Sequence, residues 1–145
     1  GETHRLQMKL GIGEAMVVDD SYNANPLSVL AAIDWLSRLP NERILVLGDM
    51  LELGDASLQW HTDVGEAAKN AGISRLYGLG DAAKSAVAAF GDHAQHFMDQ
   101  KKLLAALVPS LSSRSTVLVK GSHAMGMKAI VDQLALADHH NSEVG

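Results

Sequence analysis

The sequence predicts an α/β fold with a mainly parallel sheet, an N-terminal hairpin and helices on both faces. Short apolar runs typical of strands alternate with amphipathic segments typical of helices, which indicates crossover units. The run Ile44-Leu45-Val46-Leu47 is continuously apolar, as in a parallel strand that is covered on both faces. With 145 residues and 47% hydrophobic content, the chain has enough apolar surface for one core. These observations indicate a Rossmann-like, doubly wound domain.

The first two strands are expected to form the hairpin. Leu6, Met8 and Leu10 alternate with polar residues, so we expect this side of the first strand to be buried. A glycine-rich turn at 11–13 then leads into a second strand at 15–19.

Helices and strands alternate through the rest of the chain. Asn25 before Pro26 is suited to cap a helix, which should end before Pro40. Leu58 and His61 lie on the apolar side of the next helix, where a lone histidine is more often a hydrogen-bonded core residue than a ligand. The further expected strands are 43–47, 75–79, 95–98 and 116–120, and the expected helices after the first are 57–71, 81–90, 99–111 and 125–137.

Composition excludes several classes of protein. The net charge is −5 and basic residues do not cluster, which argues against a nucleic-acid or anionic-membrane surface. The absence of cysteine excludes disulfides and thiol chemistry and is compatible with a reducing cytoplasm. We see no signal peptide and no membrane span. We expect one domain over residues 1–137 and a flexible tail over 138–145.

In such a sheet, ligands bind at the carboxyl ends of the strands, where loops and helix N-termini converge. Asp20, Tyr22 and Asn23 follow the second strand; they could bind the ribose and base of a nucleotide or form a solvated turn. Asp49 and Glu52 follow the next strand; they could bind Mg²⁺ or an ammonium group, or Asp49 could cap the loop while Glu52 is solvated.

Two further strand ends carry polar motifs. Residues 78–83 fit G-x-G-x-x-A and Asp99 follows about 20 residues later, so a dinucleotide site is one alternative, although the motif falls late in the fold. Lys120 and Ser122 could bind a carboxylate or phosphate, or the lysine could simply be exposed. The sequence contains no phosphate loop of the G-x-x-x-x-G-K-[ST] type.

Taken in order, five motifs resemble the C-terminal domain of the Mur ligases. The resemblance spans residues 5 to about 134, and the combination of the second and third motifs is its most specific part. The motifs are RLQ at 5–7, DDSYNANP at 19–26, GDMLELG at 48–54, H-x-x-V-G at 61–65 and KGS at 120–122.

The resemblance implies part of a cytoplasmic, ATP-dependent ligase of peptidoglycan precursor synthesis, and hence of cell-wall formation, cell shape and division. Such an enzyme activates UDP-N-acetylmuramoyl-tripeptide as an acyl phosphate, which the amine of D-alanyl-D-alanine attacks. Its N-terminal and central domains would be the partners of this chain. The central domain would hold the phosphate loop and most of the Mg²⁺ site, so the resemblance implies no catalytic and no metal-binding residue here and no activity of the isolated chain.

Positions that match the family motifs give the expected binding residues. Those for ATP are Arg5 at phosphate, Asp20 at the ribose, and Tyr22 and Asn23 against the nucleotide. Those for D-alanyl-D-alanine are Lys120, Ser122 and His123.

Two positions depart from the family pattern, because His123 stands where an arginine is usual and Lys128 where a glutamate is usual. They favour a second alternative besides the dinucleotide module, namely a non-catalytic interaction domain of the same fold.

Overall fold

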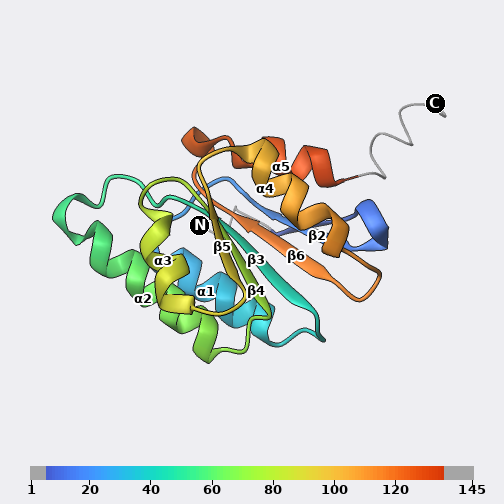
Figure 1. Ribbon diagram of the computed structural model, residues 1–145, viewed down its shortest axis with the longest axis horizontal. Coiled ribbons are helices and arrows are strands. Elements are labelled where there is room, and N and C mark those ends of the chain that lie inside the picture. Colours follow the sequence, from blue (N-terminus) through green and yellow to red (C-terminus); the bar gives the residue numbers. More distant parts are fainter. Residues whose placement is uncertain (1–5, 136–145) are drawn as a thin grey trace.

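The computed structural model describes residues 6–135, which form one six-stranded sheet between two layers of helices (Figure 1). The strand order is β1-β2-β6-β3-β4-β5. Only β1 runs antiparallel to its neighbour, and the other pairs are parallel. The predicted fold class is therefore confirmed. The strands are β1 (Gln7–Leu10), β2 (Met16–Asp20), β3 (Arg43–Gly48), β4 (Arg75–Leu79), β5 (Ala94–Phe97) and β6 (Thr116–Lys120).

The helices cover both faces of the sheet, as Figure 1 shows. The first three pack on the face that presents Leu45 and Leu47, and the last two pack on the face that presents Ile44 and Val46. Because consecutive side chains of β3 enter opposite cores, residues 44–47 are all apolar. The helices are α1 (Pro26–Ser37), α2 (Ser57–Asn70), α3 (Ala83–Phe90), α4 (Gln100–Leu107) and α5 (Met127–Leu134).

The predicted helix cap at Asn25 is confirmed. The Asn25 side chain accepts a hydrogen bond from the Ser28 N–H at 2.9 Å, and the Ser28 hydroxyl accepts one from the Asn25 N–H at 3.1 Å. Two amides that the first turn of a helix leaves unpaired are thus satisfied, and Pro26 follows at the first helical position.

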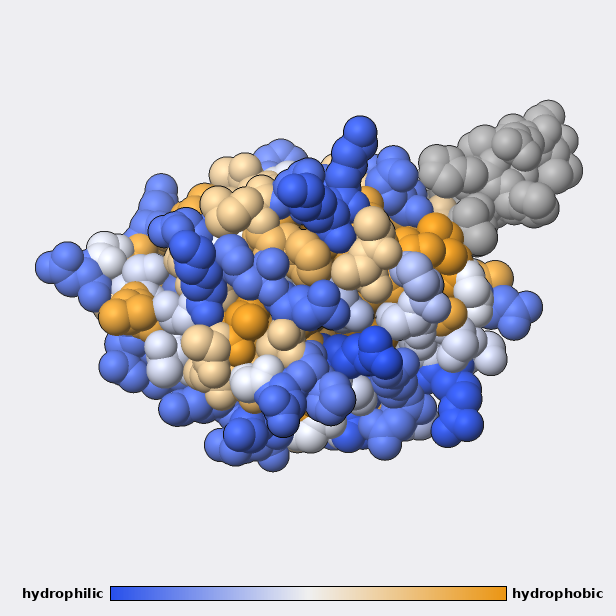
Figure 2. All heavy atoms as spheres, in the orientation of Figure 1, coloured by the Kyte–Doolittle hydropathy of each residue, from blue (hydrophilic) through white to orange (hydrophobic). Residues whose placement is uncertain are grey.

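Two expectations about burial are wrong. Met8 and Leu10 are 55% and 54% exposed, because β1 is the edge strand and α1 packs on β3 and β6 instead. Leu58 is 69% exposed, because the first turn of α2 extends beyond the sheet at the left of Figure 1. On the face seen in Figure 2, apolar residues gather in small groups between polar ones.

Helix ends were predicted less well than strands. The helix expected at 81–90 begins at Ala83, the one expected at 99–111 ends as an α-helix at Leu107, and the last begins at Met127. The expected tail at 138–145 lies outside the described residues.

The strand order determines where a site can form. Strand β6 lies between β2 and β3, although it is the last of the six strands in chain order. The loops after β2 and β3 lead to helices on one face, whereas the loop after β6 leads to α5 on the other. Adjacent strands whose connections leave toward opposite faces open a crevice at their carboxyl ends.

Candidate functional site

A pocket of about 270 Å³ lies at this crevice. It is formed by the loops after β2, β3 and β6, which carry the motifs DDSYNANP, GDMLELG and KGSH. Residues predicted for the nucleotide and residues predicted for the dipeptide thus line one pocket. Its lining consists of Tyr22, Asn23, Ala24, Leu51, Glu52, Ser122, His123 and Ala124.

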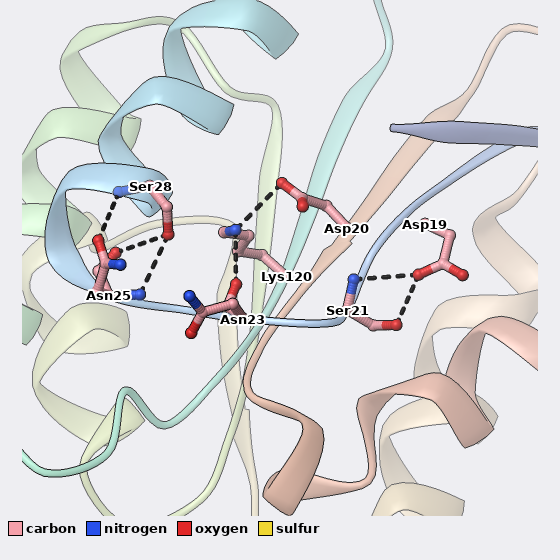
Figure 3. A network of polar contacts seen from close by, with 7 residues as sticks. All are labelled: Asp19, Asp20, Ser21, Asn23, Asn25, Ser28 and Lys120. Atoms are coloured by element: carbon pink, nitrogen blue, oxygen red, sulfur yellow. Dashed lines mark hydrogen bonds and ion pairs between the residues drawn. The ribbon is translucent and has the colours of Figure 1, made fainter. Parts of the chain in front are cut away.

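Much of the DDSYNANP stretch serves to hold its own loop, as Figure 3 shows. Asp19 accepts hydrogen bonds from the Ser21 N–H at 3.0 Å and the Ser21 hydroxyl at 2.6 Å. Asp20 lies 3.2 Å from the Lys120 ammonium, which also donates to the Asn23 carbonyl at 2.7 Å. The loop is therefore tied to the end of β6, a strand almost 100 positions later in the chain.

The Asp20–Lys120 ion pair is buried. The two side chains are 6% and 2% exposed, and neither residue is among those that line the pocket. Lys120 is thus not the exposed strand-end lysine that was one reading of the sequence. Direct contact of either group with a ligand would require the pair to open, so the ligand roles predicted for Asp20 and Lys120 stay predictions.

Burial also changes how Lys120 titrates. Loss of hydration lowers the pKa of Lys120 below its ordinary value of 10.5, and the Asp20 carboxylate offsets part of that effect.

We expect this shift to make folding stability depend on pH. Between the lowered pKa and 10.5 the unfolded chain binds more protons at Lys120 than the folded chain, so stability should rise with pH in that window. Urea unfolding at several pH values should show the wild type gaining stability relative to Lys120→Met as the pH rises toward 10.5. A difference that does not vary with pH would contradict the shift.

Four of the predicted binding residues do line the pocket. Tyr22 is 70% exposed, and Asn23 and His123 are also exposed. The Ser122 hydroxyl is buried and has no hydrogen-bond partner among residues 6–135, which is uncommon for a native polar group and fits a ligand contact. Arg5, predicted at the ATP phosphate, lies outside the described residues.

The turn at 78–83 is not an open anion site. Asp49 reaches from the end of β3 and accepts hydrogen bonds from the Ala82 N–H at 3.1 Å and the Ala83 N–H at 2.8 Å. A carboxylate thus occupies the position at the start of α3 where a pyrophosphate would bind. A side chain at Gly80 would collide with the same carboxylate. Asp49 therefore caps α3 and not its own loop. The sequence did not indicate this contact.

His61 fixes the next part of the same loop. Its ring is fully buried, and Nε2 accepts a hydrogen bond from the Met50 N–H at 3.0 Å. The Nδ1 atom lies 2.7 Å from the Ser57 carbonyl, so we assign the proton to Nδ1, which donates. The prediction of a hydrogen-bonded core histidine is confirmed.

The described part of the chain offers no cluster of three or more His, Asp or Glu side chains that could hold a metal ion. Within the same residues, no helix has the length and apolarity needed to cross a membrane.

Comparison with known proteins points to one family. Residues 4–123 match the family described as "Mur ligase, glutamate ligase domain". The UDP-N-acetylmuramoyl-tripeptide–D-alanyl-D-alanine ligase of Escherichia coli is 41% identical over 121 residues, which is 82% of this chain and 26% of that protein. The protein of the same name from Buchnera aphidicola subsp. Acyrthosiphon pisum is 36% identical over 121 residues, again 82% of this chain and 26% of that protein. The chain thus spans about a quarter of the length of these relatives.

Solved structures agree. MurF from Acinetobacter baumannii superposes with a TM-score of 0.79 at 28% identity, over 92% of this chain and 30% of that one. MurF ligase from Thermotoga maritima, in complex with ADP, superposes with a TM-score of 0.75 at 25% identity. The match covers 90% of this chain and 29% of that one.

Proposed function

Because the chain belongs to the Mur ligase family through its glutamate ligase domain, we propose that it is the C-terminal domain of the ATP-dependent ligase that joins D-alanyl-D-alanine to UDP-N-acetylmuramoyl-tripeptide. The observation that carries this proposal is the pocket in which the three motif loops meet. The two relatives are named as ligases of UDP-N-acetylmuramoyl-tripeptide and D-alanyl-D-alanine, which supports the choice of substrates.

In this proposal the chain supplies one wall of a site that the other domains complete. A volume of about 270 Å³ lies slightly below the usual range for small-molecule pockets, so the pocket by itself suits a dipeptide or part of a nucleotide. Tyr22 and Asn23 would contact the nucleotide, and an exposed aromatic ring is suited to stack on a base. Ser122 and His123 would contact the dipeptide.

The buried pair would hold these contacts in place. Lys120 joins Asp20 to the backbone of Asn23, so it fixes the loop that presents Tyr22. Three contacts are predicted from the family resemblance alone. Arg5 would bind the ATP phosphate, Asp20 the ribose and Lys120 the dipeptide carboxylate.

The proposal extends to the rest of the enzyme. The ligase would act in the cytoplasm and have N-terminal and central domains, and the central one would hold Mg²⁺. Residues 1–137 of this chain would form one domain. The alternative of a dinucleotide module loses its support, because Asp49 occupies the start of α3.

The test is ligation by the full-length enzyme. Purified protein should form UDP-N-acetylmuramoyl-pentapeptide from the tripeptide, D-alanyl-D-alanine and ATP, with one ADP and one phosphate released per amide bond. The 145-residue chain alone should turn over nothing, because its sequence has no phosphate loop. Omitting the dipeptide serves as the control. Ligation by the isolated chain would refute the proposal. A full-length enzyme that does not use D-alanyl-D-alanine as a substrate would refute it as well.

A further inference from the structure

Among the residues that line the pocket, Glu52 is the one carboxylate. The other three acids of these motifs have partners. Ser21 donates to Asp19, Lys120 pairs with Asp20, and the amides at the start of α3 donate to Asp49. Within residues 6–135, no hydrogen bond or ion pair joins Glu52 to another residue. Its carboxyl oxygens are therefore available to a ligand.

The loop presents Glu52 in a defined position. The residues two and three positions before it are anchored, because the Met50 N–H donates to the buried His61 and the Asp49 carboxylate accepts from the Ala82 and Ala83 amides. Glu52 itself has φ of +63°, a left-handed conformation that glycine or asparagine would adopt at lower cost. A glutamate that persists in such a conformation at a pocket points to a role for its side chain.

The rest of the pocket complements a small zwitterion. Ser122 contributes a buried hydroxyl without a partner, and His123 contributes a group that can carry positive charge. Both can bind a carboxylate. The side chains of Ala24, Leu51 and Ala124 are apolar and suit methyl groups. A ligand with an amine at one end, a carboxylate at the other and two methyls between them fits this set.

We infer that Glu52 binds the amine end of D-alanyl-D-alanine and so selects a dipeptide with a free amino terminus. The inference rests on the proposed function, which supplies the dipeptide. A carboxylate accepts hydrogen bonds from an ammonium group and from a neutral amine, since both carry N–H, so the contact persists when the amine loses its proton to become a nucleophile.

The experiment combines a change in the protein with a change in the ligand. In the full-length enzyme, Glu52→Gln keeps the shape of the side chain and removes its charge. The Michaelis constant for D-alanyl-D-alanine should rise about tenfold or more. The inhibition constant of propanoyl-D-alanine, which has a hydrogen in place of the amine and so no donor at this end, should change by less than about twofold, as should the Michaelis constant for ATP.

Asp55→Asn is the matched control, because Asp55 is an exposed acid three positions away that does not line the pocket. It should leave all three constants unchanged. An unchanged constant for the dipeptide in Glu52→Gln would overturn the inference, and so would an equal loss for propanoyl-D-alanine or for ATP. A wild-type enzyme that does not use the dipeptide would instead show that the proposed function has failed.

Discussion

Replacing Lys120 by alanine should lower the free energy of unfolding of this chain by about 3 to 5 kcal/mol. The substitution removes the Lys120 ammonium from the Asp20 carboxylate, which is 6% exposed as a side chain. It also removes the donor to the Asn23 carbonyl and leaves space where a fully buried side chain lay. Since domains of this size are stable by about 5 to 15 kcal/mol, much of the total stability would be lost. Urea unfolding of the purified chain measures the effect.

The double variant Asp20→Asn/Lys120→Met is the control, because it removes both charges and keeps most of the volume. It should be more stable than Lys120→Ala, since a buried pair replaced as a whole costs far less than a pair broken on one side. If Lys120→Ala unfolds within about 1 kcal/mol of the wild type and instead raises the Michaelis constant for the dipeptide in the full-length enzyme, Lys120 is a ligand contact and not mainly a structural one.

The fold could be predicted from the sequence because most of its signals are local. β4 and β6 have the bounds that their apolar runs indicated, and Asn25 caps the helix that its sequence pattern predicted. The exposure of Met8 and Leu10 could not be predicted from the local sequence. Alternation shows which side of a strand is apolar, whereas burial depends on whether a helix covers that side.

The sequence predicted where the site lies, but it did not predict which residues of the site contact one another. Loops at the carboxyl ends of strands were expected to carry it, and the pocket lies there. The pairing of Asp20 with Lys120 depends on β6 lying between β2 and β3, which is a property of the sheet order. The bond from Asp49 to the start of α3 likewise spans more than 30 positions. Neither contact leaves a signal at short range in the sequence.

Asp49 also separates the proposed function from the dinucleotide alternative, and its removal should have the second largest effect on stability. Asp49→Ala leaves the Ala82 and Ala83 amides without a partner at the start of α3. Loss of a charged cap with two hydrogen bonds should cost about 2 to 3 kcal/mol in urea unfolding.

Asp81→Ala is the matched control for this variant. Asp81 is also an acid at the start of α3, but its side chain is 82% exposed and pairs at 3.4 Å with an exposed Lys84. Its loss should therefore cost at most about 1 kcal/mol. Titration with NAD provides a second measurement. The wild type should not bind it at this turn, because a carboxylate already occupies the amides and would repel a pyrophosphate. Binding of NAD to the wild type, weakened by Asp99→Ala or by a substitution at Gly78, together with no loss of stability in Asp49→Ala, would restore the dinucleotide alternative.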